Sequence, residues 1–159
     1  MATPRDIRRL AFQALFQLDA RSESETEPLR AMVEAAASEE VGKFSPEEIN
    51  RAFTLASEAY KARRDADAAM NELAPTWPAH RQPAVDRAIL RLAHYEMTQG
   101  GAAGSAAANP KVVVNDAIEL AKTYSTDRSP AFVNGLLDKV LKRVLADGKA
   151  ANTPVDSDQ

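Results

Sequence analysis

The amino-acid sequence predicts an all-α fold, and three features of the sequence support that prediction. Apolar residues recur in several segments at the i, i+3, i+4, i+7 spacing that places them on one face of a helix. A serine or threonine followed by proline marks a helix start at Thr3-Pro4, Ser45-Pro46 and Ser129-Pro130. Strand signals do not recur along the chain.

The first predicted helix begins at a capping box formed by Thr3 and Asp6. Polar residues 22–26 then break the pattern, and a second helix is predicted over residues 28–40. Ser45 opens a third helix, which we expect to run to about residue 73. The apolar face of the first helix consists of Ile7, Leu10, Ala11, Ala14, Leu15 and Leu18.

Residues 75–78 are rich in proline and predict a joint, followed by a short helix at 78–82. Residues 85–97 are apolar on more than one side, so we expect the helix there to be the most buried. Residues 98–109 are rich in glycine and alanine and predict a loop. A further helix is predicted over residues 110–124.

The last helix is predicted to begin at Ser129 and to end at Asp147-Gly148, because glycine is frequent just past a helix end. Its inner face consists of Phe132, Val133, Leu136, Leu137, Val140, Leu141 and Val144. We expect residues 149–159 to be a disordered tail.

Composition excludes several classes of protein. The 159 residues include no cysteine, which excludes disulfides, thiolate nucleophiles and cysteine-bound zinc. No segment approaches the roughly 20 apolar residues that a membrane-spanning helix needs, and the N-terminus lacks the pattern of a signal peptide. These features predict a cytoplasmic protein without a membrane span.

The charge distribution predicts local recognition of an anionic partner. A net charge of −3 argues against nucleic-acid binding by charge over the whole molecule. The first 21 residues nevertheless carry four arginines and two aspartates, and residues 22–48 are rich in glutamate. Such a reversal of sign along a chain can serve recognition at one place.

The first helix has a second face of interest. At about 100° per residue, five side chains lie roughly 100° to 200° from Ile7, opposite the apolar face. These are Arg5, Arg8, Arg9, Phe12 and Phe16. Arginine binds phosphates and aromatic rings stack on bases, so this face predicts an RNA-binding surface. In the alternative interpretation, Phe12 and Phe16 pack under another helix and the arginines are only solvated.

Signals for catalysis or a metal site are weak. His80 and His94 have no second ligand at metal spacing, so both are interpreted as structural. The glycines at 100–104 lack the Gly-Lys-Ser/Thr of a phosphate loop. Four acidic residues, Asp86, Glu96, Asp116 and Glu119, are expected to form salt bridges on helix surfaces. We therefore expect no enzymatic activity, no cofactor and no metal.

Three segments together resemble a known family. They are residues 8–16 (RRLAFQALF), Trp77 with residues 85–96 (VDRAILRLAHYE), and residues 110–124 (PKVVVNDAIELAKTY) followed by 132–139 (FVNGLLDK). In order and spacing they resemble the NusB family of bacterial transcription antitermination factors, over residues 4 to about 145. The resemblance implies one RNA-binding domain over residues 1–145, made of two packed three-helix bundles at about 4–73 and 78–147.

The resemblance also implies a function without chemistry. Members of the family pair with NusE, a protein of the small ribosomal subunit. The pair holds the boxA element of nascent ribosomal RNA within the RNA polymerase antitermination complex, so that polymerase reads through terminators. A homodimer in which the RNA-binding surface is masked is a further expected state.

By resemblance, RNA-binding positions fall on Arg5, Arg8 and Arg9, with Phe12 on the same helix. Further candidates for RNA contact are Lys122, Tyr124, Arg128, Phe132 and Asn134. Two purely structural alternatives stay open. Asn134-Gly135 could serve only close helix packing, and Lys122 could form only an exposed pair with Glu119. Arg128 stands in a loop where the family tends to be acidic, which would strengthen attraction to RNA.

Partner-binding candidates are Phe16, Asp86 and Arg91. Asp86 stands where the family places an acidic residue facing the ribosomal protein, and Phe16 stands where a tyrosine is common. Other departures from the family are Arg9, where an acidic residue is usual, and Asp116, which replaces a common glutamate.

Two rival functions remain at this point. One is a stand-alone relative of the RNA-binding domain of ribosomal-RNA cytosine methyltransferases. Such a relative could not methylate RNA alone, because the chain lacks a Gly-rich cofactor loop and a catalytic cysteine. The other is a helical adaptor that binds only protein. RNA binding predicts a steep dependence on salt, whereas an adaptor predicts little.

Overall fold

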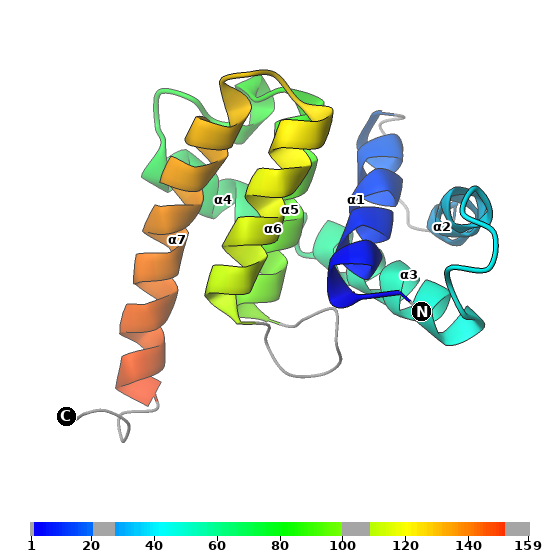
Figure 1. The fold of residues 1–159 in the computed structure, drawn as a ribbon. Coiled ribbons are helices and arrows are strands. Elements are labelled where there is room, and N and C mark those ends of the chain that lie inside the picture. The colour runs from blue at the N-terminus through cyan, green and yellow to red at the C-terminus, as the bar shows by residue number, and fades with distance from the viewer. Residues whose placement is uncertain (1, 21–27, 100–108, 152–159) are drawn as a thin grey trace.

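A computed structural model describes residues 2–20, 28–99 and 109–151, and this part of the chain contains helices and no strand (Figure 1). The predicted all-α fold is therefore confirmed. The α-helices are α1 (Pro4–Ala20), α2 (Leu29–Ser38), α3 (Pro46–Lys61), α4 (Arg63–Leu73), α5 (Ala84–Thr98), α6 (Pro110–Tyr124) and α7 (Ser129–Ala151), with a short 3-10 helix, η1 (Ala79–Arg81).

The helices form two groups that share one core. Helices α1, α2 and α3 pack on one another, as do α5, α6 and α7, and α1 packs against α5 to join the groups. Figure 1 shows α2 and α7 at opposite sides of the molecule, with α1, α5 and α6 between them. Helix α4 contacts α3, α5 and α7 and so connects the groups. The bundle boundaries at 4–73 and 78–147 stay a prediction.

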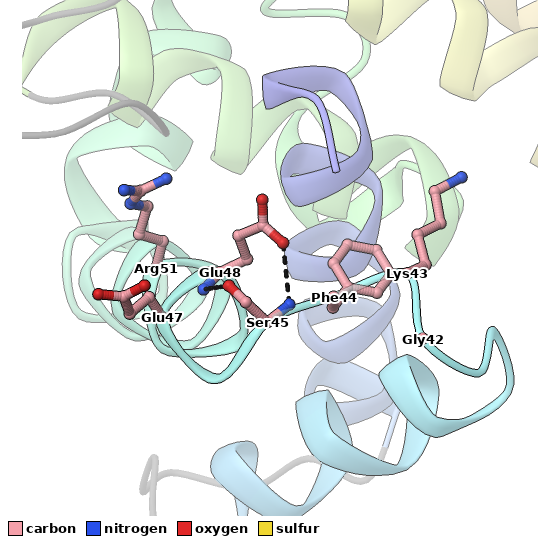
Figure 2. Close-up of a pocket in the computed structure, with 7 residues that line it drawn as sticks. All are labelled: Gly42, Lys43, Phe44, Ser45, Glu47, Glu48 and Arg51. Atoms are coloured by element: carbon pink, nitrogen blue, oxygen red, sulfur yellow. Dashed lines mark hydrogen bonds between the residues drawn. The ribbon is translucent and has the colours of Figure 1, made fainter. Parts of the chain in front are cut away.

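Two helix starts follow the local sequence as predicted. Thr3 Oγ1 accepts the Asp6 N–H at 3.1 Å, and the Asp6 carboxylate accepts the Thr3 N–H at 2.9 Å. At the start of α3, Ser45 Oγ accepts the Glu48 N–H at 3.1 Å and Glu48 accepts the Ser45 N–H at 2.9 Å (Figure 2). This hydrogen bond from the Ser45 N–H lowers the pKa of Glu48 below its ordinary value.

The structure corrects two predicted helix ends. The third predicted helix breaks at Ala62, whose φ of −92° and ψ of 10° separate α3 from α4. The break redirects the chain so that α4 packs on α5 and α7. The last helix does not stop at Gly148 but continues to Ala151, since a single glycine costs a helix only about 1 kcal/mol.

Helix α5 is the most buried helix, as predicted, with nine of its fifteen residues buried. Four of them, Ile89, Leu90, Leu92 and Met97, pack in the shared core. The predicted loop lies mainly in residues 100–108 and most of the predicted tail in 152–159, both outside the described residues. Within the described ranges, no helix combines the length and apolar character needed to cross a membrane.

Candidate nucleic-acid interface

Arg8 lies inside the protein, which corrects its predicted place on a solvent face of α1. Its side chain is 6% exposed. Its Nε donates to both carboxylate oxygens of Glu96 at 2.9 Å, and its Nη1 donates to Asp116 Oδ2 at 2.7 Å. The helical periodicity of α1 correctly predicts that Arg8 points away from the apolar face. It cannot predict that α5 and α6 cover that side of the helix. The guanidinium therefore joins three helices and is not presented to a ligand.

Glu96 and Asp116 are buried rather than placed on helix surfaces as predicted. Their side chains are 1% and 4% exposed. Two carboxylates so close together and shielded from water need a cation, and Arg8 supplies it. Asp86 is also buried, at 3%, so the surface interpretation holds only for Glu119.

Arg5 remains at the surface. Its Nε donates to Asp116 Oδ1 at 2.9 Å, and its side chain is 64% exposed. Asp116 thus fixes one edge of the guanidinium while most of the side chain faces solvent. This geometry suits a forked phosphate contact, because an oriented arginine loses less entropy on binding.

Arg9 is held by acidic neighbours. Its Nη1 and Nη2 donate to the two oxygens of Glu40 at 2.7 and 3.2 Å, and Lys43 Nζ lies 3.3 Å from Asp6 Oδ1. Burial raises the pKa of Asp6, but hydrogen bonds from Thr3 and the nearby Lys43 outweigh it and lower the pKa to about 2. Because Glu40 binds two nitrogens of Arg9, a phosphate would have to compete with Glu40 for the Arg9 guanidinium.

The aromatic residue that reaches the surface here is Tyr124 and not Phe12. Phe12 is 2% exposed, so the alternative interpretation holds for this ring, but not for the arginines, because Arg8 is buried. The Tyr124 ring lies over Phe12 with centroids 5.1 Å apart, and its hydroxyl accepts a hydrogen bond from Gln13 at 3.1 Å. Phe16 is half-buried, with its centroid 6.4 Å from that of Phe12.

Two hollows meet at Tyr124. One, of about 210 Å³, is lined by Arg5, Arg8, Arg9 and Asp116 among others. The other, of about 500 Å³, has largely apolar walls that include Phe12, Phe16, Ala35, Ala36 and Val85. Tyr124 lines both. One ring therefore separates a charged side of the surface from an apolar side.

Asp86, Arg128 and Phe132 come together in a third hollow, of about 420 Å³, between the chain before α5 and the start of α7. Asp86 accepts hydrogen bonds from Ser125 at 2.6 Å and Ser129 at 2.9 Å. Its carboxylate is thus already engaged, although it still lines the hollow. Arg128 is exposed and Phe132 is half-buried.

Asn134 and Gly135 are both exposed, one turn into α7. A Cβ added at Gly135 would meet nothing within 4 Å, so the alternative that this pair serves close packing is wrong. Lys122 forms the exposed pair with Glu119, at 3.4 Å, that the second alternative describes.

Arg91 is mostly buried and forms salt bridges with two aspartates of neighbouring helices. Its Nη2 lies 2.7 Å from Asp67 Oδ2 and its Nη1 lies 3.2 Å from Asp19 Oδ1. These pairs join α5 to α4 and α1, and the Arg91 side chain is only 10% exposed. These contacts support a structural role for Arg91, and its expected role in partner binding stays a prediction.

Sequence reasoning missed Asp116 as the residue that orients Arg5, and Glu40 as the partner of Arg9. Neither contact follows a helical spacing, because Asp116 is 111 residues from Arg5 and Glu40 is 31 from Arg9.

A further hollow, of about 380 Å³, lies at the start of α3. Lys43 lines it and points away from Glu48 (Figure 2). Among the described residues, no group of three acidic or histidine side chains could hold a metal ion.

Comparison with known proteins bears on this surface. The model of the NusB family matches residues 5–142. The chain belongs to the NusB family. A transcription antitermination protein NusB from Herpetosiphon aurantiacus is 36% identical over 137 residues, covering 86% of this chain and 88% of the relative.

Solved NusB structures have the same fold. The structure of T. maritima NusB aligns with a TM-score of 0.72 at 28% identity, over 89% of this chain and 92% of that one. A structure of antitermination factors NusB and NusE in complex with dsRNA aligns with a TM-score of 0.70 at 24% identity, over 87% and 96%. The resemblance read from the sequence is thereby confirmed, and with it a family of non-enzymatic antitermination factors.

Proposed function

We propose that this protein acts in transcription antitermination by binding boxA-type RNA of ribosomal RNA transcripts together with a NusE-type ribosomal protein. Membership of the NusB family supports the process. RNA binding is supported above all by one observation: Arg5 and Tyr124 line the same hollow. The Arg5 guanidinium is oriented there by its hydrogen bond to Asp116, and the Tyr124 ring is exposed. Such pairs suit phosphate and base contacts with single-stranded RNA.

In this proposal the three arginines of α1 have different roles. Arg5 contacts a phosphate directly, Arg9 does so in competition with Glu40, and Arg8 holds α1 in place. Lys122 is exposed on α6 and paired with Glu119 at 3.4 Å, and it adds a positive charge two residues before Tyr124 in the chain, on a different part of the helix surface. Arg128, Phe132 and Asn134 extend the surface at the start of α7.

The apolar hollow beside Phe16 is the surface proposed for the NusE-type partner. It adjoins the charged hollow through Tyr124, so one bound protein there would lie next to bound RNA. The chain carries 20 lysines and arginines against 23 aspartates and glutamates, a modest basic content that fits weak binding of RNA alone and stronger binding with a partner. We also propose that the complex joins RNA polymerase in the cytoplasm, and that a homodimer would cover the same surface.

The test is fluorescence anisotropy of a boxA-type RNA at two salt concentrations, with and without the cognate NusE-type protein. We expect binding that weakens steeply with salt and strengthens with the partner, because phosphate contacts release counterions. A well-folded protein that binds no RNA under either condition would overturn the proposal. Sizing of the protein in solution would then separate a masked homodimer from a helical adaptor.

Binding of structured ribosomal RNA with no preference for boxA would instead favour the methyltransferase-domain relative. A scrambled RNA of the same length and composition provides the matched control. Because the phosphate charge is equal in the two RNAs, any difference in affinity reports base contacts alone.

A further inference from the structure

The hollow at the start of α7 contains an aromatic residue to which no role has been given. Trp77 lies on the chain between α4 and η1 and lines this hollow together with Phe132, Arg128 and Asp86. Its side chain is 37% exposed, which is unusual for a tryptophan in a protein with a well-filled core. An exposed aromatic residue within a basic and aromatic hollow is a feature of surfaces that bind single-stranded nucleic acid.

A cation already lies over the Trp77 ring. The Arg81 guanidinium carbon is 5.3 Å from the ring centroid. Trp77 lines the hollow, whereas Arg81 is not one of the described residues that line it. The ring therefore presents surface to the hollow that Arg81 does not cover.

This hollow has an exposed positive charge and a buried negative charge. Arg128 lines the hollow and is exposed to solvent, and none of the described acidic residues forms an ion pair with it. Asp86 lies within, 3% exposed, with its oxygens bound to the hydroxyls of Ser125 and Ser129. A phosphate is attracted to the edge and repelled from the interior, while a neutral base can enter.

We propose that Trp77 is a stacking platform for one unpaired nucleobase of the bound single-stranded RNA, with the adjoining phosphate held at the edge by Arg128. The proposal rests on the RNA binding proposed above and names a residue and a position for it. Phe132 also lines the hollow, on the side of α7, and offers a second aromatic ring to the base. Every base has a stacking face, so this contact adds affinity with little preference for sequence.

Trp77 is the single tryptophan of the chain, so tryptophan emission, excited selectively over that of the tyrosines, reports on this hollow. The first experiment titrates the full-length protein with an unlabelled boxA-type RNA and records tryptophan emission. Anisotropy of the labelled RNA is measured in parallel. We expect the emission to change with the same midpoint as the anisotropy, because a stacked base quenches the indole.

The second experiment compares variants. Trp77→Ala should weaken RNA binding by roughly 5- to 150-fold, whereas Trp77→Phe should retain most of the affinity. Because Trp77 carries no charge, Trp77→Ala should leave the salt slope unchanged. Arg128→Ala should lower that slope by about one phosphate contact. Arg64→Ala, at an exposed arginine of α4, is the matched control and should change neither quantity.

The outcomes separate this inference from the proposed function. Salt-sensitive RNA binding with unchanged Trp77 emission, and wild-type affinity in Trp77→Ala, would overturn the stacking role alone. Emission that responds to the NusE-type protein and not to RNA would assign the hollow to the partner and also overturn it. Absence of any RNA binding would overturn both. If Trp77→Ala fails to fold, the wild-type titration and Trp77→Phe still decide.

Discussion

Arg8 and Glu96 form a buried ion pair in which the Arg8 Nε lies 2.9 Å from both oxygens of the Glu96 carboxylate. The pair connects α1 to α5, and Asp116 adds α6 through a contact of 2.7 Å. A surface on α1 can act together with residues of α6 only if the two helices keep a fixed relation. We therefore assign to Arg8 the positioning of Arg5 and Tyr124 rather than contact with RNA.

Replacing Arg8 with methionine should destabilise the protein by about 3–5 kcal/mol, because the buried carboxylates of Glu96 and Asp116 would lose the guanidinium that contacts both of them. Chemical denaturation followed by circular dichroism measures this change. Lys142→Ala, at an exposed pair with Asp138, is the control and should alter stability by less than about 1 kcal/mol. A stability loss in Arg8→Met no larger than in the control would contradict the assigned role.

Local signals in the sequence were sufficient for the helix starts, because a capping box joins residues three positions apart. Thr3 with Asp6 and Ser45 with Glu48 are both present as predicted. The exposure of α1's second face was not predictable in this way. The residues that cover Arg8 come from positions 88 and 108 residues further along the chain.

The resemblance to the NusB family identified the surface but not the state of each arginine. Family motifs place residues in the fold, whereas their availability depends on neighbours specific to this chain. Arg9 and Glu40 show this, since the carboxylate that engages Arg9 lies just after α2. The break at Ala62 was similarly hidden, because residues 46–73 keep a helical pattern across it.

Arg5→Ala should weaken the binding of RNA and lower the slope of log affinity against log salt by about 0.7, as expected for one lost contact with single-stranded RNA. The loss should be nearly equal for boxA-type and scrambled RNA, since phosphates carry no sequence information. Anisotropy titrations at several salt concentrations measure both quantities. Arg64→Ala again provides a charge-matched control, and an unchanged slope in Arg5→Ala would show that Arg5 does not contact phosphate.

Glu40→Gln should strengthen RNA binding by roughly 2- to 5-fold, because Arg9 would no longer be held by a charged competitor. The Glu40 oxygens lie 2.7 and 3.2 Å from the Arg9 nitrogens, and this contact lowers the pKa of Glu40. Glu47→Gln removes the same charge at an exposed position on α3 and serves as the control. Equal effects of the two variants would mean that general repulsion of RNA, and not release of Arg9, accounts for the gain.

Asp6 should make the stability of the protein depend on pH in the acid range. Its pKa falls on folding from an ordinary value of 3.8 to about 2, because bonds from Thr3 and Lys43 outweigh the effect of burial. A carboxyl group with a lowered pKa stabilises the folded state above its unfolded pKa, and this contribution is lost as pH falls through the folded pKa. Thermal unfolding from pH 5 to pH 2 should therefore show a steeper loss of stability in the wild type than in Asp6→Asn. Parallel curves for the two proteins over that range would show that the contacts of Asp6 with Thr3 and Lys43 do not stabilise the charged form.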